Sequence, residues 1–418
     1  MHDFIYKSNE LYCEKLRVSD IIKKVGTPAY IYSHKTFVDH IEKIKKAFRA
    51  VKPIICYSMK ANSNLAILKT IVKRGAGLDI VSSGELYRAK RVECDARKIV
   101  FAGVGKSEAE IEDALRYGIL LFNVESEAEL EMIDKVAKRR HQKARVSLRV
   151  NPGVDPHTHD HIATGKSESK FGMDFQTARA IFLKRAQYTG LHLSAIHVHI
   201  GSQIISGDPF VEAFQKVLGF IDELERAKVR LDYLNLGGGL GAVYNDESPQ
   251  TADQFAARIL PLFQGRRFRL IFEPGRFVAA NGGILVSRVL YIKGTDVKNF
   301  AIIDAGMNDL IRPSLYDAYH EILPVHKSEK TAQEVYDVVG PICESGDYFA
   351  KARKIQKLSA GDYVAIMSSG AYGFVMASNY NSRPRACEVL VKGNKFAVVR
   401  KRETFQSLVA GETIPALV

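Results

Sequence analysis

The chain has 418 residues, more than one small domain usually contains, so two or three domains are expected. Hydrophobic residues make up 46% of the sequence and charged residues 26%, as in an ordinary soluble globular protein. A formal net charge of +13 calls for nucleic-acid binding to be considered, but the basic residues are scattered and no nucleic-acid-binding motif accompanies them. We therefore expect no nucleic-acid partner.

The sequence also lacks the features of a membrane or secreted protein. No apolar run approaches the length of a membrane span, and the start, Met1 to Phe4, does not resemble a signal peptide. The five cysteines, at positions 13, 56, 94, 343 and 387, lie far apart and form no CxxC pair. This spacing argues against a disulfide framework or a zinc site. We expect a protein of the reducing cytoplasm without membrane contact.

After residues 1 to about 33, which contain short strand-like pieces such as 29–32, eight apolar runs alternate with segments of helical periodicity. The runs are 53–57, 78–81, 99–101, 119–122, 146–150, 195–200, 231–236 and 268–272. Eight repeats of strand and helix predict parallel strands, and eight strands close an α/β barrel of the (β/α)8 TIM type. A doubly wound open sheet is the competing fold.

From about residue 280 the pattern changes to strands with little helix between them. The predicted strands are 283–292, 300–304, 335–339, 363–367, 386–390 and 396–399. They predict a C-terminal antiparallel β domain, a sandwich or barrel, that also takes in the N-terminal strands. The expected division is a barrel domain at 27–279 and a β domain formed by 1–26 and 280–418.

Lys60 lies just past the first apolar run. A buried ammonium group needs a counter-charge or loses its proton. A neutral lysine is a nucleophile suited to forming a Schiff base with a carbonyl, including that of pyridoxal phosphate. The alternative is a lysine that extends to solvent at a strand end, so Lys60 alone decides nothing.

Other reactive side chains also follow the predicted strands. In a parallel barrel, function gathers at the carboxyl ends of the strands. The residues at those ends are Lys60, Asp79, Glu85, Arg149, Asn151, His199, Ser202, the glycines at 237–239, Glu273, Gly275 and Arg276. Each could be structural by itself, but their convergence on one rim predicts a functional site.

Two glycine turns on this rim suit an anion, because bare backbone N–H groups can approach it closely. A tight turn explains one glycine run equally well, but a second turn with Arg276 after the neighbouring strand favours phosphate. Glu273 ends an apolar strand and needs a cationic partner, which a protonated pyridine nitrogen supplies. That proton makes the ring an electron sink for decarboxylation. His199 is placed to stack on such a ring or to serve as a core histidine.

Together these motifs resemble the pyridoxal-phosphate-dependent decarboxylases with an alanine-racemase-like barrel (fold type III), and within them the diaminopimelate decarboxylases. The resemblance covers essentially the whole chain. The motifs that carry it are residues 57–62, 151–155, 170–172, 197–203, 237–239, 273–276, 304–313 and 343–347. It implies decarboxylation of meso-2,6-diaminopimelate at its D-centre to give L-lysine and carbon dioxide, the last step of lysine biosynthesis.

The resemblance also implies roles for individual residues. Lys60 would be the Schiff-base lysine, His199 the ring-stacking residue and Glu273 the partner of the pyridine nitrogen. The cofactor would further contact Ser202, Gly239, Pro274, Gly275, Arg276 and Tyr372, and the substrate Arg276, Arg312, Tyr316, Glu344 and Tyr372. Cys343 would return a proton to the carbanion. In a two-fold homodimer the partner subunit would supply the motif that begins at Cys343.

The choice of substrate has a physical basis as well. Decarboxylases of ornithine must hold a cationic distal end, which Arg312 would repel. An arginine fork matches a carboxylate, and Glu344 can pair with an ammonium group beside it. A distal end with both groups is an amino-acid head, as in diaminopimelate. The alternative for Arg312 is a structural ion pair.

Other interpretations remain open at this point. A decarboxylase of ornithine, arginine or carboxynorspermidine would share the fold, as would a racemase, although Glu273 speaks against a racemase. A non-catalytic relative should lack Lys60 or Cys343. The segment 155–172 contains His157, His159 and His161, which invite a metal interpretation; a polar lid over the site fits them better, because no carboxylate or cysteine completes a ligand set. We expect no metal.

Overall fold

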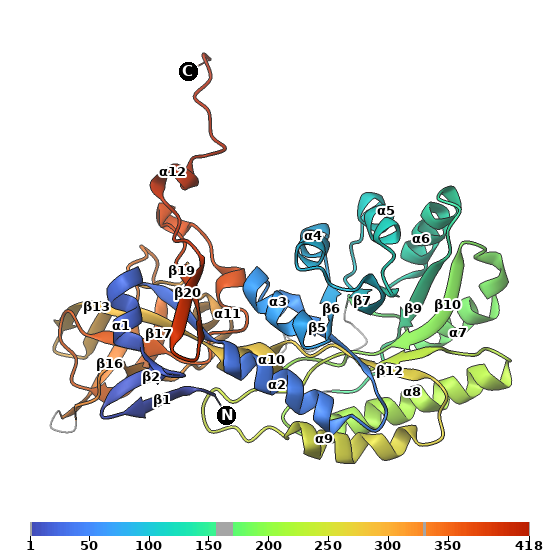
Figure 1. Ribbon diagram of the computed structural model, residues 1–418, viewed down its shortest axis with the longest axis horizontal. Helices are drawn as coiled ribbons and strands as arrows, with labels where there is room; N and C mark the ends of the chain where they lie inside the picture. Colours follow the sequence, from blue (N-terminus) through green and yellow to red (C-terminus); the bar gives the residue numbers. More distant parts are fainter. Residues whose placement is uncertain (1, 156–169, 329–331, 418) are drawn as a thin grey trace. The chain divides into compact units, whose positions relative to one another are not determined.

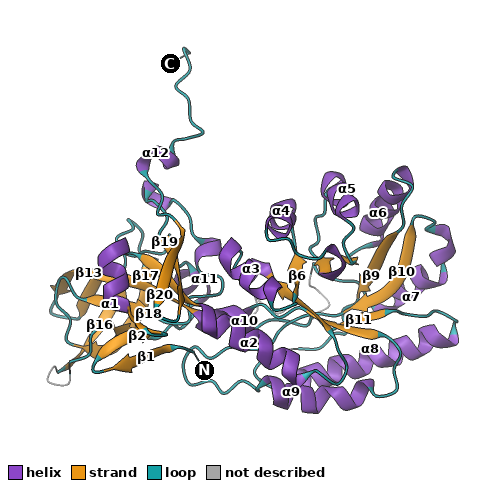
Figure 2. Cartoon of the chain, in the orientation of Figure 1, coloured by secondary structure: helices purple, strands orange, loops and turns teal. Residues whose placement is uncertain are grey.

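The computed structural model describes residues 2–155, 170–328 and 332–417 (Figures 1 and 2). Contacts divide the chain into two compact units. The barrel unit consists of Val38–Ala242 and Glu247–Val278, and the β-rich unit of Met1–Phe37, Val243–Asp246 and Ala279–Val418. The lid and metal alternatives for 155–172 rest on three histidines at 157, 159 and 161, which lie outside the described residues.

Eight strands close the barrel unit into a ring, and every neighbouring pair is parallel. They are β5 Ile54–Ser58, β6 Gly77–Ile80, β7 Ile99–Phe101, β8 Leu121–Val124, β9 Ala144–Arg149, β10 Leu191–His197, β11 Tyr233–Asn235 and β12 Arg269–Phe272. The ring closes where β12 pairs with β5. The predicted (β/α)8 barrel is confirmed, and the open doubly wound sheet is excluded. β10 ends at His197, so His199 lies beyond the strand.

Helices cover the outside of the ring, as Figure 1 shows, and all but the first of them follow a strand of the ring. They are α2 His34–Ala47, α3 Leu65–Lys73, α4 Ser83–Arg91, α5 Glu108–Tyr117, α6 Glu127–Arg139, α7 Phe175–Leu183, α8 Asp208–Arg226, α9 Ala252–Ile259 and α10 Arg276–Ala279. Their ends follow local chemistry. Ser107 and Glu110 form a capping box at the start of α5, and Gly118 ends that helix in a left-handed conformation.

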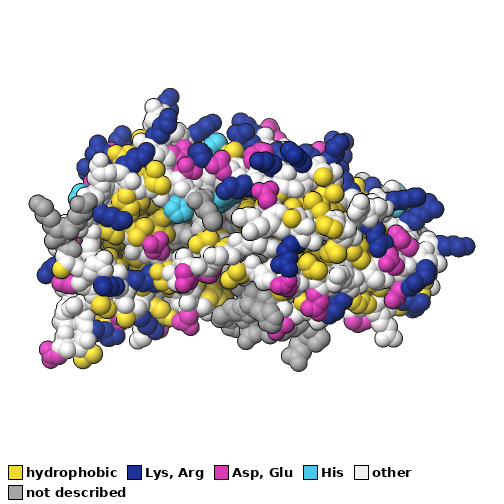
Figure 3. Space-filling model, turned by 90° about the horizontal axis from the view of Figure 1, so that it is seen from below, with side chains coloured by type: hydrophobic (Ala, Val, Ile, Leu, Met, Phe, Trp, Pro, Cys, Tyr) yellow, Lys and Arg dark blue, Asp and Glu magenta, His cyan; other side chains and the backbone are white. Residues whose placement is uncertain are grey.

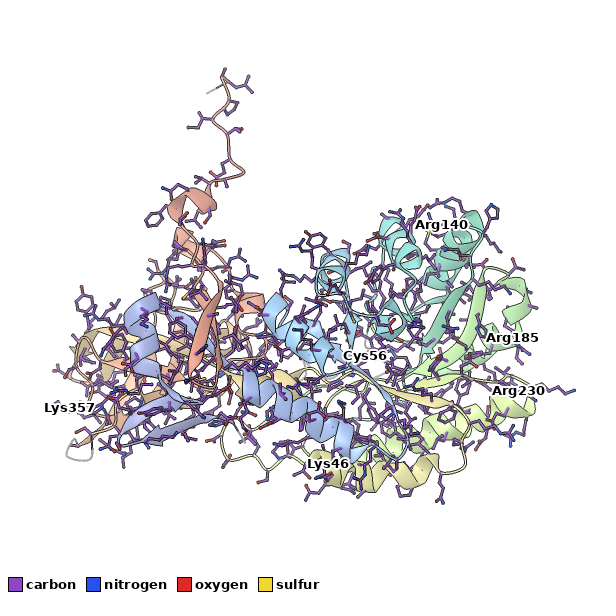
Figure 4. All side chains as sticks on the ribbon, viewed as in Figure 1. Lys46, Cys56, Arg140, Arg185, Arg230 and Lys357 are labelled. Atoms are coloured by element: carbon purple, nitrogen blue, oxygen red, sulfur yellow. The ribbon has the colours of Figure 1, made fainter. Side chains whose placement is uncertain are left out.

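The inside of the ring is apolar toward the amino-terminal ends of the strands. Ile54, Cys56, Val100 and Ile271 belong to one buried cluster there. Cys56 lies at the centre of the barrel unit in Figure 4. Polar side chains occur at the opposite, carboxyl ends, where the sequence predicts the site.

The β-rich unit contains a nine-stranded sheet and a separate three-stranded sheet. The larger sheet contains β4 Ala29–Ser33, β13 Gly283–Gly294, β14 Asn299–Ile303, β15 Ile322–Pro324, β16 Gln333–Val339, β17 Tyr348–Gln356, β18 Tyr363–Ile366, β19 Cys387–Lys392 and β20 Lys395–Arg400. The smaller sheet contains β1 Phe4–Lys7, β2 Glu10–Cys13 and β3 Leu16–Arg17. Two short helices, α1 Val18–Val25 and α12 Phe405–Leu408, belong to the same unit.

Three details differ from the predictions. The sheet is mostly antiparallel, but β14 pairs with β16 and β4 with β19 in parallel. β15 and β17 were not predicted; β17 is an edge strand with exposed lysines at positions 351 and 354 and half-buried Arg353 between them, a composition that hides a strand. β4 pairs with β13 and β19, so the contacts divide the chain after Phe37, whereas the prediction divides it at residue 27.

The positive charge is spread over the surface. Figure 3 shows Lys and Arg side chains distributed over one face, with Asp and Glu between them. Arg140, Arg185 and Arg230 lie on the outside of the barrel unit in Figure 4. Among the described residues, no helix is both long and apolar enough to cross a bilayer.

Candidate active site

Glu273 is the centre of a polar cluster inside the barrel. It directly follows β12 and is 5% exposed. Its Oε1 accepts hydrogen bonds from Nδ2 of Asn123 (2.8 Å) and Nδ2 of Asn235 (2.6 Å), and its Oε2 lies 3.2 Å from Nε2 of His197. These partners come from the carboxyl ends of β8, β11 and β10. Three separate strands therefore fix one carboxylate.

This environment keeps Glu273 ionised. Burial raises the pKa of the carboxyl, but His197 and the amide of Asn235 outweigh it, and the pKa lies well below its usual value. Its Oε2 faces the imidazole of His197. The result is a buried anion that can accept a hydrogen bond from a cationic N–H group.

Asp79, on another strand of the ring, has the opposite character. It is 1% exposed, and its Oδ2 accepts a hydrogen bond of 2.7 Å from Oγ of Ser58. No described residue bonds to its Oδ1. Burial and the charge of Glu273 raise the pKa of Asp79 well above its usual value, although Lys60 lowers it. One buried carboxylate of the barrel is thus held ionised, and the other is driven toward the neutral acid.

Lys60 lies in a short 3₁₀ turn, Met59–Ala61, directly after β5, and its side chain is exposed. It is close enough to Asp79, Glu85 and His199 to shift the pKa of each. Glu85 accepts a hydrogen bond of 2.7 Å from the Val81 amide, and burial raises its pKa to about 7. The predicted strand-end position of Lys60 is confirmed, with two acids and an imidazole around it.

His199 is held from two sides. Its Nδ1 accepts a hydrogen bond of 3.1 Å from the Gly238 amide, so the proton of the neutral ring is on Nε2. Nη2 of Arg149 donates to the His199 carbonyl oxygen at 3.4 Å, and Arg149 pairs with buried Glu125 at 2.7 Å. Burial, with the charges of Arg149 and Lys60, lowers the pKa of His199 well below its usual value. The imidazole is therefore neutral.

The predicted phosphate-binding residues lie together. Nε of Arg276, the first residue of α10, donates to Oγ of Ser202 at 3.1 Å. Gly239 has φ +114°, and a Cβ there would lie 2.8 Å from the Gly201 carbonyl oxygen. Gly275 packs so closely on β5 that a Cβ would lie 3.1 Å from that of Ser58. A side chain at either glycine would therefore press on neighbouring residues of the barrel unit.

Only part of the glycine run 237–239 suits the predicted role in anion binding. The Gly237 amide donates to Oδ1 of Asn235 at 3.0 Å, and the Gly238 amide is bonded to His199. A Cβ at Gly237 would lie 2.5 Å from the Val198 carbonyl oxygen. The first two glycines therefore serve packing and internal hydrogen bonds, which leaves Gly239 as the member of the run that suits an anion.

In the β-rich unit, Cys343 and Glu344 lie on the loop between β16 and β17. Cys343 is exposed, whereas the other four cysteines are buried. The Cys343 amide donates to Oδ1 of Asn381 at 2.8 Å, and the Tyr380 hydroxyl donates to Glu344 at 3.1 Å. Asp347 fixes the base of the loop, because its carboxylate accepts the amides of Met307 and Ile342, each at 2.6 Å.

The predicted substrate-binding residues Arg312 and Tyr316 are the first and last residues of α11 Arg312–Tyr316. Arg312 is 7% exposed and Tyr316 is half-buried. Tyr372 has φ +55°, a strained conformation for a bulky residue and one that functional sites retain. These residues belong to the β-rich unit, as do Cys343 and Glu344. The barrel unit contains the other predicted site residues, which are Lys60, His199, Ser202, Gly239 and Glu273 to Arg276.

Comparison with known proteins identifies the family. Residues 34–280 match the model of the pyridoxal-binding domain of pyridoxal-dependent decarboxylases. The diaminopimelate decarboxylases of Vibrio cholerae and Pseudomonas aeruginosa are each 45% identical to the chain, over 416 and 414 residues, and in both cases 99% of each protein is covered. The chain belongs to the diaminopimelate decarboxylase family. The predicted family, enzyme class (carboxy-lyase) and pyridoxal 5'-phosphate cofactor are thereby confirmed.

Solved structures of diaminopimelate decarboxylases share the fold. That from M. jannaschii has a TM-score of 0.95 at 36% identity, covering 99% of this chain and 98% of its own. The Helicobacter pylori structure complexed with L-lysine has a TM-score of 0.91 at 42% identity, with 94% and 98% covered. A lysine/ornithine decarboxylase from Vibrio vulnificus is 22% identical and shares the fold alone. The predicted fold class is confirmed.

The residues that sequence reasoning missed are those that support the predicted ones. Asn123, Asn235 and His197 hold Glu273, Ser58 holds Asp79, and Glu125 holds Arg149. An asparagine at the end of an apolar strand was the available signal for the first two. Among the described residues, no cluster of histidine, cysteine and carboxylate side chains could hold a metal ion.

Proposed function

We propose that this member of the diaminopimelate decarboxylase family removes the carboxylate from the D-centre of meso-2,6-diaminopimelate and releases L-lysine and carbon dioxide. The observation that carries the proposal is the buried, ionised carboxylate of Glu273, fixed by Asn123, Asn235 and His197. Such an anion forms a strong hydrogen bond with a cationic N–H group, and a protonated pyridine nitrogen is such a group. The complex of the Helicobacter pylori relative with L-lysine agrees with this product.

The residues of the barrel unit fit pyridoxal phosphate. Arg276 and Ser202 offer a cation and a hydroxyl for the phosphate, and the close packing at positions 239 and 275 admits no side chain there. Lys60 offers an amine for the aldehyde, and neutral His199 offers a flat ring for stacking. When bound, pyridoxal phosphate supplies an electron sink for the bond to the departing carboxylate. Pro274, between Glu273 and Gly275, completes the cofactor contacts.

Each side chain of the proposed site then has a separate role in the reaction. Glu273 keeps a proton at the pyridine nitrogen, because its low pKa leaves it unable to take that proton for itself. Arg276 and Tyr372 orient the reacting end of the substrate. Arg312, with Tyr316 beside it on α11, binds the distal carboxylate, and Glu344 binds the distal ammonium group. Cys343 delivers a proton to the carbon that has lost its carboxylate.

We further propose a two-fold homodimer in which each active site takes Lys60 from one subunit and Cys343 from the other. The exposure of Cys343 and Glu344 on their loop supports a role at a surface that a partner covers. The free, buried state of the other four cysteines suits a reducing compartment, and we propose the cytoplasm.

Carbon dioxide release from meso-diaminopimelate, ornithine, arginine and lysine tests the substrate. We expect release from meso-diaminopimelate well above that from the other three, with L-lysine as the product. Equal or faster release from ornithine or arginine would refute the proposal, because a distal arginine disfavours a bare ammonium group.

Mixing two inactive variants tests the shared site. Lys60→Ala and Cys343→Ala subunits are allowed to exchange, and a mixed dimer then has one site with both defects and one site with none. Random exchange makes half the dimers mixed, so about a quarter of the wild-type activity should return. If mass measurement confirms exchange and no activity appears, each site is built within one chain.

A further inference from the structure

Two aromatic side chains enclose Arg312 in the β-rich unit. Nη1 of Arg312 lies 2.9 Å from Nε2 of His320, which is fully buried. The guanidinium carbon of Arg312 lies 4.6 Å from the centre of the Tyr244 ring. The two rings meet edge to face, with centroids 5.4 Å apart and planes at 84°. The guanidinium is thus bounded by a ring face on one side and an imidazole nitrogen on another.

The contact with Arg312 fixes the state of His320. A guanidinium has only donors, so Nε2 of His320 must accept the hydrogen bond. The ring proton is then on Nδ1, which lies 2.8 Å from the Met367 carbonyl oxygen and donates to it. Nη1 of Arg353 donates to the carbonyl oxygen of His320 at 2.9 Å and holds its backbone. His320 is therefore neutral and uses both ring nitrogens.

Tyr244 is held just as firmly. It follows Val243, whose carbonyl oxygen accepts hydrogen bonds from Nδ2 of Asn281 (2.7 Å) and Oγ of Ser368 (3.2 Å). These bonds attach the segment Val243–Asp246 to the β-rich unit, although it follows barrel strand β11 in the chain. The ring of Tyr244 therefore meets Arg312 as part of that unit, and an arginine above a tyrosine face is attracted to it.

We propose that His320 and Tyr244 are positioning residues that set the direction of the Arg312 guanidinium for the distal carboxylate of the substrate. The inference rests on the proposed role of Arg312. A neutral imidazole orients the guanidinium without cancelling its charge, whereas an aspartate or glutamate at this place would compete with the substrate carboxylate. A guanidinium held in advance also loses less conformational freedom on binding.

Two ligands that differ in the carboxylate test the proposal. L-lysine keeps the distal carboxylate of diaminopimelate, and 1,5-diaminopentane has the same chain without it. We measure their inhibition constants (Ki) against meso-diaminopimelate and their affinities for the holoenzyme by calorimetry. The ratio of the value for 1,5-diaminopentane to the value for L-lysine reports recognition of the carboxylate. In His320→Leu, we expect Ki for L-lysine to rise about tenfold or more, as for the loss of a hydrogen bond to a charged group, and Ki for 1,5-diaminopentane to change less than about twofold.

Matched variants separate the contacts. His320→Gln keeps an acceptor for Arg312 and should restore part of the loss. Tyr244→Phe keeps the ring and should bind L-lysine as the wild type does. Tyr244→Leu should weaken L-lysine binding about threefold to tenfold, the loss expected of a cation–π contact. If His320→Leu does not fold, the Gln variant and the two Tyr244 variants still decide. If the variants weaken the binding of both ligands equally, the two residues have a general structural role and the proposal is overturned.

Arg312→Ala distinguishes failure of this inference from failure of the proposed function. It should weaken L-lysine binding at least as strongly as His320→Leu does and should not weaken the binding of 1,5-diaminopentane, whose bare distal ammonium group Arg312 disfavours. If Arg312→Ala leaves the ratio unchanged, Arg312 does not bind the distal carboxylate, and both proposals about it fall. If Arg312→Ala changes the ratio while the His320 and Tyr244 variants do not, the positioning role alone is wrong.

Discussion

The two groups of proposed catalytic residues are held in different ways. In the barrel unit, Glu273 is 5% exposed and receives hydrogen bonds from asparagines on two strands of the ring. In the β-rich unit, Cys343 is exposed on a loop, and a hydrogen bond from its backbone amide to Asn381 holds it there. The carboxylate is fixed by secondary structure, and the thiol by the shape of a loop.

This difference matches two different roles in the proposed reaction. A group that must keep one charge state and direction throughout the reaction gains from rigid, buried neighbours. A group that delivers a proton to a substrate needs access to it, which burial would remove. The exposed loop also suits a surface completed by a second subunit. Variants of the barrel group should therefore alter the binding or the protonation of the cofactor, whereas variants of the loop should slow the reaction and leave both unaltered.

The largest effect is expected for Lys60→Ala. The variant should lose both decarboxylation and the visible absorbance of bound cofactor, because the amine that follows β5 is removed. Absorbance spectra and carbon dioxide release measure the two losses. Lys69→Ala is the control, since Lys69 pairs with exposed Glu93 and should be dispensable. Borohydride reduction of the wild type should label Lys60; a label on another lysine would contradict the assignment.

Cys343→Ala comes next. Turnover should fall about 10²- to 10⁴-fold, as for the loss of a positioned general acid. The cofactor spectrum should stay that of the wild type, because the barrel group is untouched. Stopped assays for L-lysine and absorbance spectra of the same preparations give both values. A changed spectrum with intact turnover would reverse the roles assigned to the two regions.

Much of the fold could be predicted because its pattern is local. Each barrel strand is an apolar run followed by an amphipathic helix, so the ring and its carboxyl ends follow from the sequence, and with them Lys60, His199 and Glu273. β17 was missed because lysines occupy two of its exposed positions and hide its apolar pattern. The predicted boundary at residue 27 assigned β4 to the barrel domain, because its pairing with β13 and β19 is a contact with residues far along the chain.

The supporting residues of the site were missed for a related reason. Asn123 is the next-to-last residue and Asn235 the last residue of a short apolar strand, and nothing in their own segments shows that both amides point at one carboxylate. The same holds for Tyr244 and His320, which meet Arg312 from separate parts of the chain. A family motif identifies residues that touch the reaction, whereas those that hold them become visible only in three dimensions.

The third prediction compares two neutral isosteres within the barrel. Glu273→Gln should bind cofactor and lower turnover about 10²- to 10³-fold, because an amide cannot hold a proton at the pyridine nitrogen. Asp79→Asn should stay within a few-fold of the wild type, because the raised pKa of Asp79 already favours its neutral form. Steady-state kcat for both variants decides. Similar losses in the two would remove the distinction between an ionised and a neutral carboxyl.

The smallest effect is one of stability, and here the two carboxyls should act in opposite directions. The usual pKa of Asp79 is 3.8, and in the folded chain it is raised, so the unfolded state releases this proton at a lower pH than the folded state does. Stability contributed by the neutral acid is therefore lost as pH rises above the unfolded pKa. An asparagine side chain does not titrate, so Asp79→Asn should raise the melting temperature of the holoenzyme, with a gain that grows as the pH rises above the unfolded pKa.

Glu273→Gln gives the matched reverse. The usual pKa of Glu273 is 4.5 and the folded value is lower, so its ionised form contributes stability above the unfolded pKa and loses it as pH falls through the folded value. Replacement by glutamine should lower the melting temperature at neutral pH, and the loss should shrink as the pH falls below about 4.5. Each unit of pKa difference corresponds to about 1.4 kcal/mol, or about 2–3 degrees in a thermal scan. Thermal denaturation of the three proteins over this range measures both signs. Shifts of the same sign at neutral pH would mean that the barrel does not hold its two buried carboxyls in opposite charge states.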